Sequence, residues 1–197
     1  MDFEIVDIEQ GTMDWLKWRA GGIGASEAPT VMRENPWKTL GELQQEKLRP
    51  RFNRPVNAAM ARGTALEPMA RAYYCDRRKI DVEPACIQSL IYPWMRASLD
   101  GINFDKNMAV EIKCGESVYK KTSYTRTVPE YYYGQLQHIL SVTGYKAIDF
   151  WCYLPEKRPV LIDVRRNESY IARLIEQEQE FWEFIEADVL KALAATD

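Results

Sequence analysis

The most informative part of the chain reads Ser98-Leu99-Asp100-Gly101 and, after nine further residues, Glu111-Ile112-Lys113. Side chains alternate between the two faces of a β-strand, so Glu111 and Lys113 are predicted on one face and Ile112 on the other. A hairpin through residues 103–107 would fold Asp100 back beside Glu111. The pattern therefore predicts two carboxylates and one amine at a single place on a β-hairpin.

Two carboxylates held this close repel each other, and the repulsion raises the pKa of one of them unless a cation offsets the charge. Mg²⁺ is the usual cation where the ligands are oxygens and the substrate is a phosphate. The amine of Lys113 can orient an attacking water or stabilise negative charge on the reacting phosphate. An ion-paired pair of strands on a solvated sheet face has the same residue pattern, so the pattern alone leaves both interpretations open.

The rest of the chain is predicted to form helices around a group of short strands. Apolar residues at helical spacing indicate helices over residues 12–19, 39–47, 57–78, 130–142 and 169–194. Short runs rich in Ile, Val, Phe and Tyr indicate strands over residues 87–91, 97–99, 109–113, 147–154 and 159–164. A Gly-rich turn over residues 21–24 precedes a further helix, for which Ser26 is the candidate N-cap. This order predicts an α/β fold with a central mixed sheet, in a single domain over residues 1–197.

The composition indicates a folded globular chain, because 46% of the 197 residues are hydrophobic and 28% are charged. No run approaches the ~18 consecutive apolar residues of a membrane span. The acidic N-terminus lacks the basic and apolar regions of a signal peptide. The four Cys form no CxxC pair and the chain has one His, which disfavours a Cys/His zinc site and predicts reduced thiols in a cytosolic protein.

The net charge of −3 conceals an uneven distribution along the chain. Nine basic and two acidic residues lie between Lys47 and Lys79, whereas nine acidic and four basic residues lie between Asp163 and Asp197. Local basic surface attracts phosphates even on an acidic protein. We therefore expect the segment Lys47–Lys79, together with Arg19, to carry phosphate-facing positive charge, although solvated helix faces would give the same pattern.

Four stretches of the sequence occur in the order that is typical of one nuclease family. They are Trp15-x-x-x-Arg19 with Gly22-Ile23-Gly24-Ala25-Ser26-Glu27; Arg62-Gly63-Thr64-Ala65-Leu66-Glu67-Pro68; the Asp100…Glu111-x-Lys113 pattern; and Tyr132-Tyr133-Gly134-Gln135-Leu136-Gln137. Together they resemble the phage-type YqaJ/lambda-exonuclease family of alkaline 5′→3′ exonucleases, which implies the PD-(D/E)XK (restriction-endonuclease-like) core. The resemblance runs from about Trp15 to Leu154. Leu99 departs from the Pro of the superfamily name, and that position only shapes the turn.

By this resemblance, the acidic residues around the hairpin form a metal site. Asp100, Glu111 and Glu67 would bind Mg²⁺ together with the main-chain carbonyl of Ile112, in a two-ion site that Mn²⁺ could also occupy. Lys113 would position the nucleophilic water. Without the resemblance, Glu67 reads as an ordinary surface residue near a helix start.

The resemblance also implies a pocket for the 5′-terminal phosphate of DNA, formed by Arg19 and Ser26. A guanidinium binds phosphate through two hydrogen bonds, and a hydroxyl at a helix N-terminus adds a donor beside free N–H groups. The three glycines of the preceding turn would let the backbone approach a ligand closely. A plain N-cap and a surface arginine are the alternative interpretation.

Further DNA contacts are expected on two helices. Tyr132 and Gln135 lie three residues apart on one helix face and match the family's Tyr-x-x-Gln motif, in which Gln135 would contact the nucleotide or the water. Met60 matches an apolar wedge that separates the end of the duplex, and Arg62 is a further candidate contact. Burial in the core is the alternative for Tyr132 and Met60. His138 is assigned a structural role.

The implied function is Mg²⁺-dependent digestion of one strand of linear duplex DNA, 5′→3′, to mononucleotides, leaving a 3′ single-stranded tail. The family typically forms a ring-shaped homotrimer around DNA and works with a single-strand-annealing recombinase. This implies a phage- or prophage-encoded protein in the cytoplasm of a bacterial host, with no membrane association. Two alternatives stay open: an endonuclease of the same superfamily, of the restriction or repair type, and a catalytically silent DNA-binding scaffold.

Overall fold

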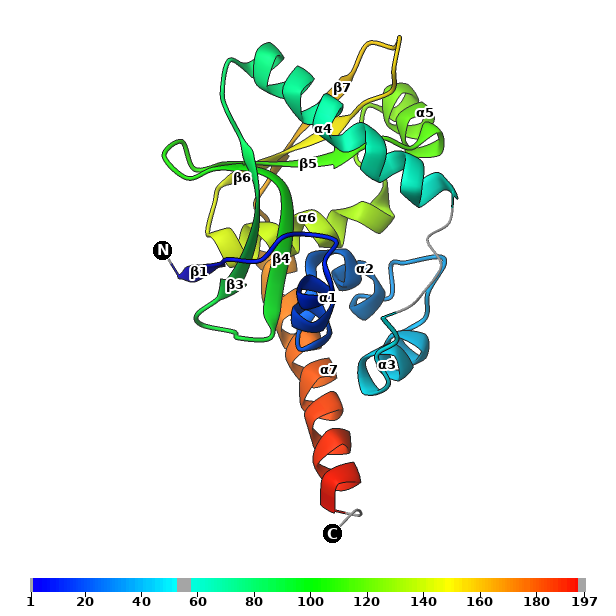
Figure 1. Cartoon of the computed structure of the whole chain (residues 1–197), viewed down its shortest axis with the longest axis vertical. Coiled ribbons are helices and arrows are strands. Elements are labelled where there is room, and N and C mark those ends of the chain that lie inside the picture. Colours follow the sequence, from blue (N-terminus) through cyan, green and yellow to red (C-terminus); the bar gives the residue numbers. More distant parts are fainter. Residues whose placement is uncertain (1, 53–57, 195–197) are drawn as a thin grey trace.

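Figure 1 shows a computed structural model of the chain, which describes residues 2–52 and 58–194. The described residues form a seven-stranded sheet. Its strands are β1 (Phe3–Val6), β2 (Ile23–Gly24), β3 (Glu83–Ser89), β4 (Met95–Asn103), β5 (Met108–Lys113), β6 (Ala147–Cys152) and β7 (Val160–Arg165). They lie in the order β1-β3-β4-β5-β6-β7, and β2 pairs with β4 off this path. The pairs β5–β6 and β2–β4 are parallel and the others antiparallel, which confirms the predicted mixed sheet.

Helices cover both faces of this sheet. They are α1 (Met13–Ala20), the short 3₁₀ helix η1 (Ala25–Glu27), α2 (Ala28–Val31), α3 (Leu40–Leu48), α4 (Ala58–Arg78), α5 (Glu116–Thr125), α6 (Glu130–Thr143) and α7 (Glu168–Ala194). Helix α4 crosses one face above β5, whereas α6 lies on the other face with α2 and α7 against it (Figure 1). Within the described part of the chain, no helix combines the length and the apolar composition needed to cross a bilayer.

The alternation of side chains along the central strands divides the core into two parts. Phe150 and Trp151 are neighbours on β6, yet Phe150 belongs to the apolar cluster that contains Leu136 of α6, and Trp151 to the cluster that contains Tyr74 of α4. A strand that is buried on both faces carries an almost continuous apolar run. This is why the β6 segment was recognisable as a strand in the sequence.

Strand β4 contains a β-bulge at its centre. Ala85 of β3 pairs with Leu99, and Glu83, two residues earlier, pairs with Ile102, so β4 has one extra residue there. As a result Leu99 and Ile102 both lie in the α6-facing cluster although they are three residues apart. The bulge interrupts the two-residue period, which explains why the predicted strand stopped at Leu99. Bulges commonly re-aim a side chain beside an active site, and Asp100 is placed in this one.

Most predicted elements are confirmed within a few residues, and Thr39 caps α3 through its side-chain oxygen. Three elements were missed: the edge strand β1, which has only four residues; the two-residue strand β2, which lies within the predicted Gly-rich turn; and α5, which is mostly polar. The predicted N-cap role of Ser26 is wrong, because Ser26 lies inside η1 and the N-cap position of α2 is Glu27. Asn57, the predicted start of the long helix, and Arg54 of the basic segment lie outside the described residues.

Candidate active site

The β4–β5 hairpin brings the two predicted carboxylates together. Gly101 pairs with Val110, and the N–H of Ile112 donates a 2.7 Å hydrogen bond to Oδ2 of Asp100. A Cβ on Gly101 would lie 2.7 Å from Val82 and 2.8 Å from Val110, so the close packing of β5 and of the loop after α4 requires glycine here. The predicted juxtaposition of Asp100 and the Glu111 strand is therefore confirmed.

Glu111 forms the centre of a buried polar group beneath α6. Its side chain is 3% exposed, and its Oε1 accepts hydrogen bonds from Lys113 Nζ at 2.5 Å and from Gln135 Nε2 at 2.6 Å. Lys113 Nζ also lies 4.8 Å from the centre of the Tyr132 ring. The structure thus brings Tyr132 and Gln135 of α6 to the carboxylate–lysine pair. Because both donors contact the same oxygen, the negative charge of Glu111 is offset on one side only.

Helix α4 supplies a third carboxylate through an arginine that sequence reasoning did not assign to the site. Arg71 Nη2 lies 2.5 Å from Oε1 of Glu67, and Arg71 Nε donates a 2.5 Å hydrogen bond to the main-chain carbonyl of Asp100. Arg71 therefore joins α4 to the bulge of β4. Its spacing of four residues after Glu67 is that of a helical ion pair, and this was the available sequence signal.

The charges of this centre shift two pKa values in the same direction. Partial burial, together with the carboxylates of Glu111 and Glu67, raises the pKa of Asp100 well above its usual range, against the opposing effect of Lys113. Burial disfavours the charged form of Lys113, but Glu111 and Asp100 outweigh this and raise its pKa. Lys113 is therefore a cation, suited to donating hydrogen bonds to a water or a phosphate oxygen.

The oxygens of the hairpin fit a hard divalent cation. Oε2 of Glu111 is buried without a hydrogen-bond partner among the described residues, and such an orphaned oxygen costs free energy that a cation would offset. The Ile112 N–H faces Asp100, so the Ile112 carbonyl lies along the same edge of β5. Among the described residues, no group of three or more His, Cys, Asp or Glu lies at ligand spacing. Glu67 is paired with Arg71 instead. Asp100, Glu111 and the Ile112 carbonyl are thus the donors that fit a metal.

Arg19 and Ser26 lie together, as predicted, on a second site beside the same strand. Arg19 Nη2 donates a 2.9 Å hydrogen bond to Oγ of Ser26, and its guanidinium lies 4.7 Å from the centre of the Trp15 ring. Trp15 Nε1 in turn donates a 2.8 Å hydrogen bond to Oγ of Ser98, two residues before Asp100. This chain of contacts places the Arg19–Ser26 pair next to the strand that carries the carboxylate centre.

The glycine turn before this pair approaches a side chain instead of a ligand. A Cβ on Gly22 would lie 2.6 Å from both Arg96 Nε and the Trp94 carbonyl, and a Cβ on Gly21 would lie 3.0 Å from Arg96 Nη1. Arg96 also donates a hydrogen bond to the Trp18 carbonyl. The expectation that the turn makes room for a ligand is therefore corrected for Gly21 and Gly22, which make room for Arg96 of β4; a Cβ on Gly24 would lie 3.4 Å from Arg19 Nε, at the Arg19–Ser26 pair.

Lys47 is also not the phosphate-facing cation that its place in the basic segment predicted. Its side chain is 4% exposed, and its Nζ lies 2.7 Å from Oε2 of Glu27 and 3.0 Å from the Arg19 carbonyl. The same Glu27 oxygen accepts a 2.8 Å hydrogen bond from the Gly24 N–H. Burial lowers the pKa of Lys47, and Glu27 opposes this. Lys47 is a structural cation that joins α3 to the Arg19–Ser26 pair.

The remaining predicted residues divide between surface and core. Met60 is 61% exposed on α4, which excludes its burial in the core, and Arg62 is exposed on the same helix. His138 is fully buried, and its Nδ1 lies 2.8 Å from Oε1 of Glu178. All four cysteines are free thiols, and three of them are buried: Cys86, Cys114 and Cys152.

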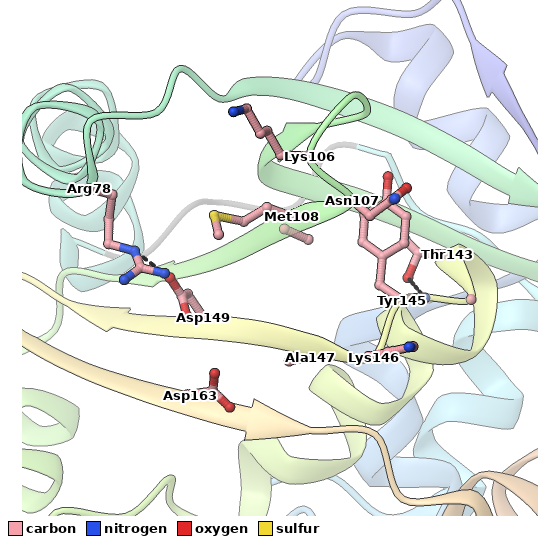
Figure 2. A pocket seen from close by; sticks show the side chains of 12 residues that line it. Arg78, Lys106, Asn107, Met108, Thr143, Tyr145, Lys146, Ala147, Asp149 and Asp163 are labelled. Atoms are coloured by element: carbon pink, nitrogen blue, oxygen red, sulfur yellow. Dashed lines mark hydrogen bonds and ion pairs between the residues drawn. The ribbon is translucent and has the colours of Figure 1, made fainter.

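A surface cavity lies at the opposite end of the hairpin from Lys113. It has a volume of about 520 Å³ and is lined by residues from the end of α4, the β4–β5 turn and the end of α6, as Figure 2 shows. Met108 lines this cavity, and it precedes Lys113 by five residues of β5, about 16 Å at ~3.3 Å per residue. The cavity is therefore separate from the carboxylate centre.

Comparison with known proteins identifies related sequences and structures. The family model described as the YqaJ-like viral recombinase domain matches residues 14–146. The uncharacterized protein YqaJ of Bacillus subtilis (strain 168) is 26% identical over 182 residues, which cover 88% of this chain and 56% of that protein. The chain thus spans about half the length of this curated relative.

Solved structures resemble the chain over almost its whole length. An alkaline exonuclease, LHK-Exo, from Laribacter hongkongensis is 28% identical with a TM-score of 0.82, covering 94% of this chain and 99% of that one. The structure of LHK-Exo in complex with dAMP is 27% identical to the chain with a TM-score of 0.81, and it covers 94% of this chain and 99% of that one. A phage-related exonuclease from Haemophilus somnus 129PT has a TM-score of 0.67 at 10% identity, covering 87% of this chain and 96% of that one, which shows the fold alone. The predicted PD-(D/E)XK fold class is confirmed.

Proposed function

Because the chain belongs to the family of YqaJ-like viral recombinase domains, we propose that it is a metal-dependent exonuclease. It digests one strand of linear duplex DNA 5′→3′ to mononucleotides and leaves a 3′ single-stranded tail. The observation that carries the proposal is the meeting of Asp100, Glu111 and Lys113 on one hairpin, with an orphaned buried oxygen on Glu111. The likeness to LHK-Exo, a protein solved with a nucleoside monophosphate, supports this reaction class.

In the proposed mechanism, the hairpin positions water at the scissile phosphodiester. Asp100, Glu111 and the Ile112 carbonyl, with Glu67 nearby, would hold one or two Mg²⁺ or Mn²⁺ ions, which would supply Lewis-acid chemistry. Lys113 donates hydrogen bonds that orient the attacking water and stabilise negative charge on the phosphate.

Gln135 and Tyr132 hold the reacting side chains in place. Gln135 donates to Oε1 of Glu111, and Oε2, which has no donor among the described residues, would be available to the metal. The ring of Tyr132 lies against the ammonium of Lys113 and stabilises its charge without competing for its protons. Both side chains come from the buried face of α6, so their positions are set by the core.

The Arg19–Ser26 pair accounts for the proposed direction of digestion. Arg19 is held against Trp15, with its guanidinium beside the Ser26 hydroxyl, and this arrangement suits a terminal phosphate. A 5′-phosphate fixed there would place the next phosphodiester at the carboxylate centre. Exposed Met60 and Arg62 on α4 are the candidate contacts to the arriving duplex.

The proposed partners concern the whole protein and rest on the family resemblance. They are a ring-shaped homotrimer around duplex DNA and a single-strand-annealing recombinase that takes over the 3′ tail. The corresponding location is the cytoplasm of a bacterial host that carries the phage or prophage.

One experiment separates this function from the alternatives. Linear and covalently closed circular forms of one plasmid are incubated with the protein and Mg²⁺, with an EDTA control. We expect release of mononucleotides from the linear form and an intact circle. Cutting of the circle would indicate an endonuclease. Binding of both forms without hydrolysis would indicate a scaffold.

A further inference from the structure

A row of three aromatic rings leads from the protein surface to Lys113. Trp37, in the loop between α2 and α3, lies edge-on to Tyr131 at the start of α6, with ring centroids 4.6 Å apart. Tyr131 and Tyr132 have centroids 4.8 Å apart, and Lys113 Nζ lies 4.8 Å from the Tyr132 ring. The outer end of the row is open to solvent, because Trp37 is 72% exposed.

Cations accompany the rings along this row. Lys121 is an exposed residue of α5, and its Nζ lies 4.9 Å from the centre of the Tyr131 ring. Lys113 Nζ lies at a similar distance, 4.8 Å, from the centre of the Tyr132 ring. Alternating rings and cations complement a single nucleic-acid strand, in which flat bases alternate with phosphates. An apolar protein partner would gain nothing from the exposed ammonium of Lys121.

The loop that presents the exposed Trp37 has a fixed backbone. The main-chain N–H of Trp37 donates a 2.9 Å hydrogen bond to Oδ1 of Asn35, and Asn35 Nδ2 donates a 2.9 Å hydrogen bond to Oγ1 of Thr30. Thr30 is 1% exposed within α2, so the loop is anchored to the core. A large aromatic side chain presented to water by an anchored loop contributes little to folding, and it is preorganised for a ligand.

We propose that Trp37 and Tyr131 form a stacking site for an unpaired base of the DNA strand beside the active centre. The three contacts of the row place the indole within about four nucleotides of Lys113, at about 3.4 Å per nucleotide. Stacking there would hold the strand end open while its phosphodiester lies at the carboxylates. This site deepens the proposed function and rests on it, because DNA is the ligand.

The test uses metal-free binding of a single-stranded oligothymidylate that carries one 2-aminopurine at successive positions. Stacking on an aromatic ring quenches the fluorescence of this base. We expect quenching within about four nucleotides of one end. Trp37→Leu should remove it and weaken binding about tenfold, the loss of one base–aromatic stack. Trp37→Phe keeps an aromatic ring and should retain most of the quenching and most of the binding affinity. Tyr124→Leu, at a 90% exposed aromatic of α5, is the matched control and should change neither.

Two results would overturn the stacking site. One is unchanged binding and quenching in Trp37→Leu. The other is a change of oligomeric state in Trp37→Leu with DNA binding intact, which would make this surface an interface between protein chains. Digestion of linear duplex is measured in parallel. Stacking without digestion would overturn the proposed hydrolysis alone, and digestion without stacking would overturn this site alone.

Discussion

Glu111 and Asp149 occupy the same kind of sequence position but have different surroundings. Each is an acid between apolar residues of a central strand, and they are 2% and 5% exposed. In the β5–β6 pair Glu111 lies opposite Phe150, and Asp149 lies opposite Val110. The two acids therefore point to opposite faces of one sheet, Glu111 toward α6 and Asp149 toward α4.

The donors around the two acids differ. Asp149 Oδ2 accepts a 2.7 Å hydrogen bond from the Tyr74 hydroxyl and lies 3.1 Å from Arg78 Nε, as Figure 2 shows for Arg78. Burial raises the pKa of Asp149, and Tyr74 and Arg78 oppose this. In both acids the donors contact a single oxygen, but Oε2 of Glu111 is buried without a hydrogen-bond partner among the described residues, whereas Oδ1 of Asp149 is not left in this way. An acid without an orphaned buried oxygen stabilises the fold, whereas an acid with one is available to a ligand.

The largest effect that follows from this difference is expected from Glu111→Gln. The amide offers no anionic oxygen to a metal and leaves Lys113 without its carboxylate, so the rate of mononucleotide release from linear duplex should fall about a hundredfold or more. Asp149→Asn is the matched control and should retain the original rate. If Glu111→Gln digests DNA at the original rate while Mg²⁺ is still required, the assignment of the site is wrong.

Removing the other acid, Asp149, should lower the stability of the fold. Asp149→Ala removes the acceptor of Tyr74 and Arg78, and the free energy of unfolding should fall by about 2 kcal/mol. Urea unfolding measures this, with Arg165→Ala, at an exposed side chain of β7, as the control. An unchanged midpoint in Asp149→Ala would contradict the stabilising role of the buried network.

The Arg19–Ser26 pair is intermediate between Asp149 and Glu111. Its two side chains are hydrogen-bonded to each other, as the side chains around Asp149 are, but the pair is accessible to a ligand. We expect 5′-phosphorylated ends to be digested about tenfold faster than 5′-hydroxyl ends, the effect of one charged hydrogen bond to phosphate. Arg19→Ala should erase most of this difference, and Arg165→Ala should leave it. Equal rates on both ends with the unchanged protein would exclude the phosphate pocket.

The smallest effect concerns the thiols that flank the carboxylate centre. Burial raises the pKa of Cys114 to about 12, with Asp100 and Glu67 adding to the shift, and burial raises that of Cys152 to about 11. Both thiols therefore stay protonated at mildly alkaline pH and should react slowly with iodoacetamide, whereas half-buried Cys75 should be labelled first. Mass spectrometry after timed labelling measures this, and urea should make all four react alike. Rapid labelling of Cys114 in the folded protein would show that the end of β5 opens.

Local periodicity was sufficient to predict the hairpin of the site. Alternation along β5 separated Glu111 from Ile112, and the short turn after β4 made an antiparallel pair the natural arrangement. The bulge at Asp100 was not predictable, because it depends on how β3 and α4 pack against β4. The family motifs contain Gln135 and Tyr132, so these residues were singled out although their contacts to β5 span 24 and 19 positions.

Residues outside those motifs were misread or missed. Lys47 was read as a surface cation because it stands in a basic segment, but its ammonium is buried and pairs with Glu27 of another helix. Trp37 and Tyr131 are far apart in the chain, so their contact left no periodic signal. In each case the deciding partner lies on an element whose position only the packed core sets.

The amino-acid sequence by itself determined the family and the order of helices and strands, and it supplied the candidate residues for a metal and a phosphate, because these depend on residue types at short spacing. The tertiary structure decided which of two similar buried acids keeps a buried oxygen without a hydrogen-bond partner. It also decided that Arg96 occupies the glycine turn and that an aromatic row reaches Lys113. The physical reason is that hydrogen-bond satisfaction and burial are properties of neighbours in space, and a linear pattern does not specify them.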